Sequence, residues 1–154
     1  MFTRLRHWRL ALTLLPGLLF NSRQRALFRE IRVFEQSLPS ALKQPLPEAL
    51  RQLTPPSGAA SASESVLRNL SDLAALLDRH SPLGLCLRRS LLRYHFLRRA
   101  GVPVVLQFGA KFSRGRPDRD IHGHAWLTLN NAVYYEDDEN WRGFTIMFAF
   151  PSHK

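Results

Sequence analysis

The change from helix to sheet falls within one stretch of the chain, Leu97-Arg-Arg-Ala-Gly-Val-Pro-Val-Val-Leu-Gln-Phe108. On its N-terminal side, apolar residues recur every three or four positions, which is the period of an α-helix. Gly101 suits the position after a helix C-terminus, and Pro103 prevents the helix from continuing. Beyond Gly101 the apolar residues alternate, which predicts a strand. The sequence therefore predicts an α+β protein, with N-terminal helices followed by an antiparallel sheet.

The predicted sheet contains four strands. A charged loop separates the first two strands, and an acidic run separates the last two. Asn130-Asn131 predicts a tight turn between the second and third strands. The strands are expected over residues 102–112, 123–129, 133–135 and 144–150.

Two helices are predicted directly before the sheet. Ser61 and Glu64 form the pattern of a capping box, so the first helix begins there and ends before Pro82. The second helix runs from about residue 85 to Arg99, and its apolar face is wide enough for a well-buried element. Many of its other residues are arginines, which we interpret as a solvent-exposed face.

An N-terminal arm precedes these helices. Apolar residues at helical spacing predict helices over residues 23–37 and 46–53. Residues 54–63 are rich in Pro, Gly, Ser and Ala, which is the composition of a flexible linker. We therefore expect a helical arm and linker over residues 1–60 and a separate domain over residues 61–154.

The first twenty residues place three arginines before a short apolar run that ends at Phe20. This order resembles a signal peptide, but the polar and basic residues that follow lack a cleavage site of small residues. Pro16-Gly17 is expected to break the run near its end. No apolar run reaches the roughly 18–20 residues that a spanning helix needs. We expect a short amphipathic helix that either docks on the domain or touches a membrane interface.

Composition limits the class of protein. Hydrophobic residues make up 45% of the 154 residues, which supplies a core and excludes a disordered, charge-driven chain. Lysine and arginine outnumber aspartate and glutamate by 22 to 12, so the net charge is +10. Such a charge suits a nucleic acid, an anionic membrane or an acidic partner. No helix-turn-helix, zinc-finger or RNA-stacking pattern accompanies it, so no nucleic-acid partner is expected.

Cys86 is the only cysteine in the chain, which excludes an internal disulfide and fits a reducing, cytoplasmic compartment. It lies close to the predicted start of a helix. A helix N-terminus presents unpaired N–H groups and about half a positive charge, which favour thiolate, the nucleophilic form of cysteine. The alternative is a structural role, because a cysteine among leucines commonly packs as a small hydrophobe.

His124 begins an alternating segment, Gly123-His-Ala-Trp-Leu127. A histidine on a strand can face a helix N-terminus that packs on the sheet, as the thiolate–imidazolium pair of a cysteine hydrolase requires. A carboxylate must then orient the imidazole ring, and the acidic run over residues 136–139 follows one turn and one strand later. The alternative for His124 is a hydrogen-bonded histidine at the edge of the sheet.

The other histidines suggest weaker alternatives. His122 and His124 lie on one face of a strand and could hold zinc together with Cys86 or His80. Because these residues lack the close spacing of zinc sites, no metal or other cofactor is expected. His80 and His95 are interpreted as histidines on helix surfaces.

Three segments carry a family resemblance: Cys86-Leu-Arg-Arg-Ser-Leu-Leu92, Leu97-Arg-Arg-Ala-Gly-Val-Pro103 and Gly123-His-Ala-Trp-Leu127. In this order they resemble the lasso peptide biosynthesis B2 proteins, the leader peptidases of the McjB C-terminal type in the transglutaminase-like cysteine protease superfamily. The resemblance covers roughly residues 82–150. It implies a transglutaminase-like or papain-like core with the nucleophile at a helix N-terminus and the histidine on the following sheet.

By this resemblance, Cys86 is the nucleophile and His124 the general base of a Cys-His-Asp triad. The aspartate of the family falls close to Glu136, with Asp137 and Asp138 adjacent. Either a glutamate replaces the aspartate here, or the register shifts by one or two residues.

The resemblance implies a cysteine peptidase that removes the leader from a ribosomally synthesised precursor peptide. Its partners would be that precursor peptide, a small leader-recognition protein of the B1 type and an ATP-dependent lasso cyclase. Two other functions would use the same features. A transglutaminase-like acyl transferase or amidase would use the same residues with a different acceptor. A catalytically inactive basic module would only bind a peptide or a protein.

Overall fold

The computed structural model describes residues 12–56, 58, 62–112, 121–136 and 140–151. Within these ranges, a helical segment at residues 12–20 precedes the other helices. The helices are α2 (Ser22–Ala41), α3 (Leu46–Leu53), α4 (Glu64–Leu77) and α5 (Leu85–Arg99). The strands are β1 (Val105–Phe112), β2 (Ile121–Leu129), β3 (Ala132–Val133) and β4 (Thr145–Phe150). This order confirms the predicted α+β architecture.

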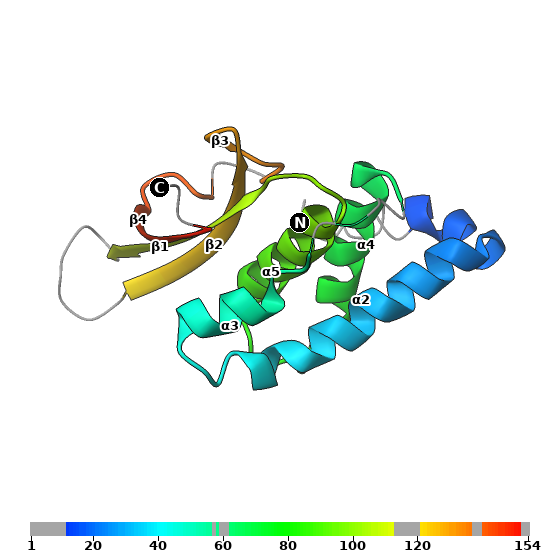
Figure 1. Cartoon of the computed structure of the whole chain (residues 1–154), viewed down its shortest axis with the longest axis horizontal. Helices are drawn as coiled ribbons and strands as arrows, with labels where there is room; N and C mark the ends of the chain where they lie inside the picture. Colours follow the sequence, from blue (N-terminus) through cyan, green and yellow to red (C-terminus); the bar gives the residue numbers. More distant parts are fainter. Residues whose placement is uncertain (1–11, 57, 59–61, 113–120, 137–139, 152–154) are drawn as a thin grey trace.

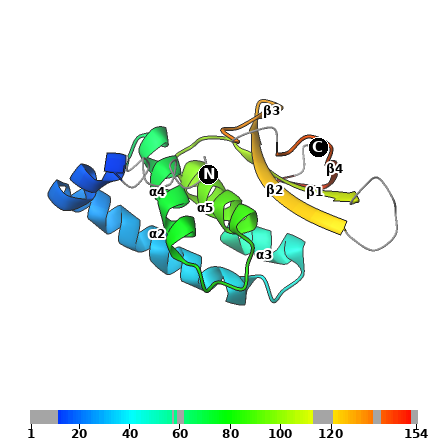
Figure 2. The ribbon, with the colours of Figure 1, turned by 180° about the vertical axis from the view of Figure 1, so that it is seen from behind.

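The sheet and the helices form two layers, with α5 at the centre (Figure 1). The strand order is β3-β2-β1-β4, and every neighbouring pair is antiparallel. α5 contacts β1 and β2 in the sheet and also packs against α2 and α4. Seen from behind, the helical segment at residues 12–20 lies at the end of the molecule away from the sheet (Figure 2). α5 therefore joins the sheet to the N-terminal helices.

The hydrophobic core includes residues from both sides of the predicted boundary at residue 60. Ile31 of α2, Leu70 of α4 and Leu92 of α5 are fully buried in one cluster. The division into an arm and a domain stays a prediction, but the arm contributes side chains to the same core as α5.

Both ends of α5 and the bounds of α3 agree with the sequence. Gly101 follows α5 with a φ of 86°, a left-handed conformation that favours glycine. The N–H of Gly101 donates to the carbonyl of Arg98 at 3.0 Å, and the N–H of Val102 donates to that of Leu97 at 2.9 Å. This is the Schellman pattern of hydrogen bonds, which satisfies the last carbonyls of the helix. α3 covers the predicted residues 46–53.

The start of α4 differs from the prediction. Ser61 lies outside the described residues, and Ser63 is the residue that precedes the helix. The Ser63 side chain makes no capping hydrogen bond. Glu64 accepts a hydrogen bond from the Tyr134 hydroxyl, so its carboxylate ties α4 to the segment after β3.

The N-terminal helical segment is continuous through Pro16 and Gly17, so the predicted break there is wrong. Gly17 lies against the side chain of Gln24 in α2: a Cβ at Gly17 would lie 1.8 Å from Oε1 of Gln24. The segment docks on the protein through buried Leu14 and through Leu18, which packs against the core. No helix in the described part of the chain has the length and apolarity to cross a membrane.

α2 and β3 differ in length from the predicted elements. α2 begins after Asn21, whose side chain accepts hydrogen bonds from two N–H groups of the first turn. It continues past Pro39 to Ala41, and Leu38 in this last turn is fully buried. The turn at Asn130-Asn131 is confirmed, with φ values of 51° and 64°. β3 is shorter than predicted because Tyr135 leaves the extended conformation, with a φ of 47°.

Candidate active site

Cys86 is the second residue of α5, as the sequence predicts. The N-cap residue of α5 is Gly84, which has no side chain. It therefore forms no capping hydrogen bond with the N–H groups of the first turn. The thiol is half-buried and is not part of a disulfide. Its place in the first turn of α5 gives it the positive end of the helix dipole.

α5 bonds to a part of β2 that β3 does not pair with. β3 pairs only with the last two residues of β2. Nearer the middle of that strand, the Ser90 hydroxyl donates to the Ala125 carbonyl at 2.8 Å. The Ala125 N–H hydrogen-bonds the sulfur of Cys86. Because both polar groups of Ala125 bond to α5, the first turns of the helix are fixed beside β2, one residue from His124.

The structure places Cys86 and His124 close enough for each side chain to shift the pKa of the other. The contact with His124 lowers the pKa of the Cys86 thiol, and hydrogen bonds from backbone N–H groups act in the same direction, against burial. The contact with Cys86 and, after it, the facing Glu136 carboxylate raise the pKa of His124 to about 9. Both shifts favour a thiolate paired with an imidazolium, which is the reactive form of a cysteine nucleophile.

Glu136 is the acidic residue that the structure places beside the histidine. Its side chain is only 1% exposed, and its Oε2 lies 3.8 Å from Nε2 of His124. This distance is that of an ion pair and is longer than a hydrogen bond. Among the described residues, Nε2 of His124 has no hydrogen-bond partner. Such contacts are commonly long in a free enzyme and shorten when substrate binds. Asp137 and Asp138 lie outside the described residues.

Two arginines of α5 hold Glu136 in place. Arg89 donates to Oε2 of Glu136 at 2.6 Å, and Arg93 lies 3.8 Å from Oε1. Arg93 also donates to both carboxylate oxygens of Asp72 at 2.6 Å and to the Tyr135 carbonyl at 2.9 Å. These contacts fix the turn at Tyr135 and direct the next residue toward the histidine.

The interpretation of the α5 arginines as a solvent-exposed face is therefore wrong for Arg88 and Arg93. Arg88 is 6% exposed and Arg93 is 2% exposed. They are buried because carboxylates of distant segments meet them inside the protein, namely Glu35 of α2 and Asp72 of α4. Sequence reasoning missed these pairs, since neither acid lies at helical spacing from its arginine.

Two aromatic side chains pack against the histidine ring. Trp126 stacks on His124 at 5.7 Å between ring centroids, and Phe144 lies at 5.3 Å. Gly109 pairs with His124 across the sheet, and a Cβ there would lie 2.7 Å from the Trp126 ring. The indole ring of Trp126 therefore packs closely over Gly109, which has no side chain. This packing fixes the indole, and the indole in turn restricts the His124 ring stacked on it. The only sequence signal was the i, i+2 spacing of His124 and Trp126, which places both on one strand face.

The other histidines of the described residues, His80, His95 and His122, are not among the groups that shift the pKa of Cys86 or His124. His80 is exposed, as predicted, and so is His122. His95 does not lie on the helix surface as predicted: its Nδ1 is 2.7 Å from the Leu53 carbonyl, and burial lowers its pKa. Within the described ranges, no group of three or more His, Cys, Asp or Glu side chains converges to hold a metal ion.

The fold and the site together define a class of protein: one with a cysteine at the start of a central helix and a histidine on the adjoining antiparallel sheet. The sequence profile described as the transglutaminase-like superfamily matches residues 30–149. The chain therefore belongs to the transglutaminase-like superfamily, whose members usually use cysteine-protease-type chemistry. This membership suggests a cysteine protease or an acyltransferase-type activity. No curated protein and no solved structure gives a significant match to the chain.

Proposed function

We propose that this protein is a cysteine peptidase that removes the leader from a ribosomally synthesised precursor peptide. The observation that carries the peptidase chemistry is the meeting of Cys86, His124 and Glu136: the thiol and the imidazole shift each other's pKa, and Oε2 of Glu136 lies 3.8 Å from Nε2 of His124. Membership of the transglutaminase-like superfamily supports the same chemistry. The leader-peptide substrate rests on the resemblance of the Cys86, Leu97–Pro103 and His124 segments to lasso peptide B2 proteins.

In this mechanism, the Cys86 thiolate attacks the carbonyl carbon of the amide bond between leader and core. The oxyanion that forms accepts a hydrogen bond from the Cys86 N–H in the first turn of α5. The His124 imidazolium then protonates the leaving amine, which becomes the N-terminus of the core, and the leader remains as a thioester. Neutral His124 next takes a proton from water. The resulting hydroxide attacks the thioester, so the leader leaves as a carboxylic acid and the thiolate returns.

Glu136 orients the imidazole and stabilises its protonated form. Arg89 and Arg93 keep the Glu136 carboxylate directed at His124, although their positive charges partly neutralise it. A glutamate would therefore take the place of the aspartate of the family. No step requires a metal ion or an organic cofactor.

The proposed partners are the precursor peptide, a small leader-recognition protein and an ATP-dependent cyclase. The buried arginines of α5 are unsuited to docking, so the partner surface falls on the N-terminal helices. Arg23, Arg25 and Arg29 of α2 are exposed. The helical segment before α2 exposes large apolar side chains, Leu12, Leu15, Leu19 and Phe20. Basic and apolar side chains together suit either an acidic partner protein or an anionic membrane surface.

The alkylation rate of Cys86 against pH tests the chemistry without a substrate. We expect the thiol to titrate below the ordinary value of about 8.5, and we expect His124→Ala to move that titration upward. An ordinary thiol that is indifferent to His124 would contradict the proposal.

Cys86→Ala distinguishes the peptidase from the alternatives. This variant should cleave no precursor peptide, while an inactive binding module would bind equally well with and without the thiol. With the wild-type protein, mass spectrometry of the products separates hydrolysis from acyl transfer. A free leader carboxylate is expected; a leader joined to an added amine would instead favour the acyl transferase.

A further inference from the structure

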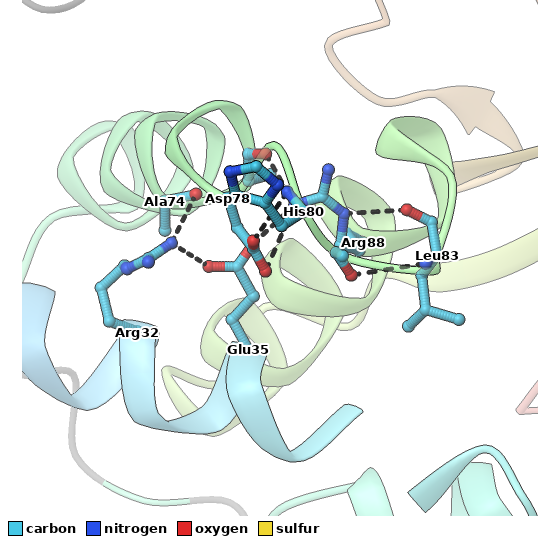
Figure 3. Close-up of polar contacts among 9 residues, drawn as sticks. Arg32, Glu35, Ala74, Asp78, His80, Leu83 and Arg88 are labelled. Carbon is cyan, nitrogen blue, oxygen red and sulfur yellow. Dashed lines mark hydrogen bonds and ion pairs between the residues drawn. The ribbon is translucent and has the colours of Figure 1, made fainter. Parts of the chain in front are cut away.

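Besides the ion pairs around Glu136, a second cluster of buried charges lies where the start of α5 meets α2 and α4 (Figure 3). Glu35 of α2 is at its centre, with a side chain that is fully buried. Its Oε2 accepts a hydrogen bond from Arg32 at 2.6 Å, and its Oε1 accepts one from Arg88 at 2.9 Å. The two arginines also donate to carbonyls in the last turn of α4, Arg32 to Ala74 and Arg88 to Ala75. The cluster thus connects α2, the end of α4 and the first turn of α5.

Arg88 extends this cluster to the turn that precedes the catalytic helix. Its Nε donates to the carbonyl of Leu83 at 3.1 Å, and Asp78 lies 4.0 Å from its Nη1. Leu83 stands immediately before Gly84, the N-cap residue of α5. One guanidinium therefore holds both ends of the connection between α4 and α5, and Cys86 lies between Leu83 and Arg88 in the chain.

We propose that Arg88, fixed by Glu35, is a positioning residue that places the first turn of α5, and with it the Cys86 sulfur and N–H, against β2. This inference rests on the proposed function of Cys86. A lysine cannot replace Arg88, because one ammonium lacks the planar fork that reaches Glu35, Ala75 and Leu83 together. Without the bond to Leu83, the turn before α5 loses its fixed position relative to the sheet.

The reactivity of the Cys86 thiol depends on the position of the first turn of α5 relative to β2. Cys86 is faced by His124 and the Ala125 N–H of β2, and Glu136 lies behind the histidine. On α5 itself, the Leu87 N–H bonds the sulfur, and Arg89 pairs with Glu136. Arg88 is not among the groups that shift the pKa of the thiol directly. A loss of thiolate in an Arg88 variant would therefore show that the sulfur had moved from its partners.

The test is the rate of alkylation by iodoacetamide against pH, measured on the full chain below its melting temperature. Arg88→Lys should shift the titration of Cys86 upward and lower the rate below neutral pH by about tenfold, the effect of one pKa unit on the thiolate fraction. Glu35→Gln keeps the side-chain shape and removes the charge that fixes Arg88. It should shift the titration in the same direction, and it serves as the second variant if Arg88→Lys does not fold.

Two controls separate positioning from general loosening. Arg99→Lys alters another arginine that ties α5 to α2, through Glu30, but at the far end of α5. Leu70→Ala removes a fully buried side chain of α4 that takes no part in the cluster's hydrogen bonds. Both controls should leave the titration of Cys86 unchanged.

The outcomes are distinguishable from a failure of the proposed function. An acidic thiol in wild type that stays acidic in Arg88→Lys and Glu35→Gln would overturn the positioning role and leave the peptidase proposal standing. An equal upward shift in Leu70→Ala would also overturn the positioning role, because any loss of stability would then be enough to raise the titration of Cys86. An ordinary thiol in wild type would overturn the proposed function and this inference with it.

Discussion

At the scale of single residues, the chemistry of this protein depends on how charge is placed around one imidazole ring. His124 lies beside the Cys86 thiol and the buried Glu136 carboxylate, and both raise its pKa, to about 9. Trp126 and Phe144 both pack against the ring and restrict its rotation. An imidazolium held in this way is available to protonate a leaving amine across the neutral pH range.

Glu136→Gln should lower the pKa of His124, because the carboxylate is the second cause of its increase after Cys86. The imidazolium form, and activity that depends on it, would then be lost at a lower pH than in the wild type. Cleavage at the optimal pH should also fall, within the roughly 10²–10⁴-fold contribution of general acid–base catalysis. An NMR titration of the His124 ring measures the shift.

Glu30→Gln is the matched control, since Glu30 also pairs with an arginine of α5 but lies away from His124. If His124 of the wild type titrates near the ordinary value of about 6.5, or if Glu136→Gln leaves its titration unchanged, Glu136 does not act on the ring.

At the scale of elements, buried ion pairs attach α5 to its neighbours. Arg88 pairs with Glu35 of α2, Arg93 with Asp72 of α4, and Arg89 with Glu136 after β3. Each pair joins segments that are distant in the sequence. A buried charge that loses its partner is strongly unfavourable, so these pairs define the position of α5 more sharply than apolar contacts alone would.

Asp72→Asn should destabilise the protein by about 3 kcal/mol, because it leaves Arg93 buried without its bidentate partner. Chemical denaturation followed by circular dichroism measures the free energy of unfolding. Glu48→Gln is the control: Glu48 pairs with Arg51 on the surface of α3, and its loss should cost no more than about 0.5 kcal/mol. Equal effects of the two variants would show that the Asp72 pair is no stronger than a surface pair.

At the scale of the whole molecule, the N-terminal helices belong to the same core as the catalytic helix. Ile31 and Leu38 of α2 are fully buried with Leu91 and Leu97 of α5. The family match also begins within α2, at residue 30. We therefore expect α2 and the sheet to unfold in one cooperative transition, even though the sequence between them has the composition of a linker.

Ile31→Ala tests this expectation. Removing a buried isoleucine should cost about 2–5 kcal/mol and lower the melting temperature of the entire protein. Far-UV circular dichroism and tryptophan fluorescence should report the same lowered midpoint. A separate early transition in the helical signal, with the fluorescence midpoint unchanged, would instead support an independent arm over residues 1–60.

Much of the fold could be predicted because local physics determined it. The end of α5 followed from Gly101 and Pro103, the turn after β2 from Asn130-Asn131, and α3 from its apolar spacing. The place of Cys86 in the first turn of a helix followed from the start of the apolar pattern. Each of these features depends on residues that are neighbours in the chain.

The sequence by itself determined the order of the elements and the two residues, Cys86 and His124, whose types suit thiol chemistry. Only the tertiary structure decided that they meet, that Glu136 faces the ring, and that Arg88 and Arg93 of α5 are buried. The physical reason is distance along the chain. Arg88 and Glu35 are 53 residues apart, and Arg89 and Glu136 are 47 apart. No local period or propensity encodes such a pairing, which forms only when α2, α4 and β2 pack around one helix.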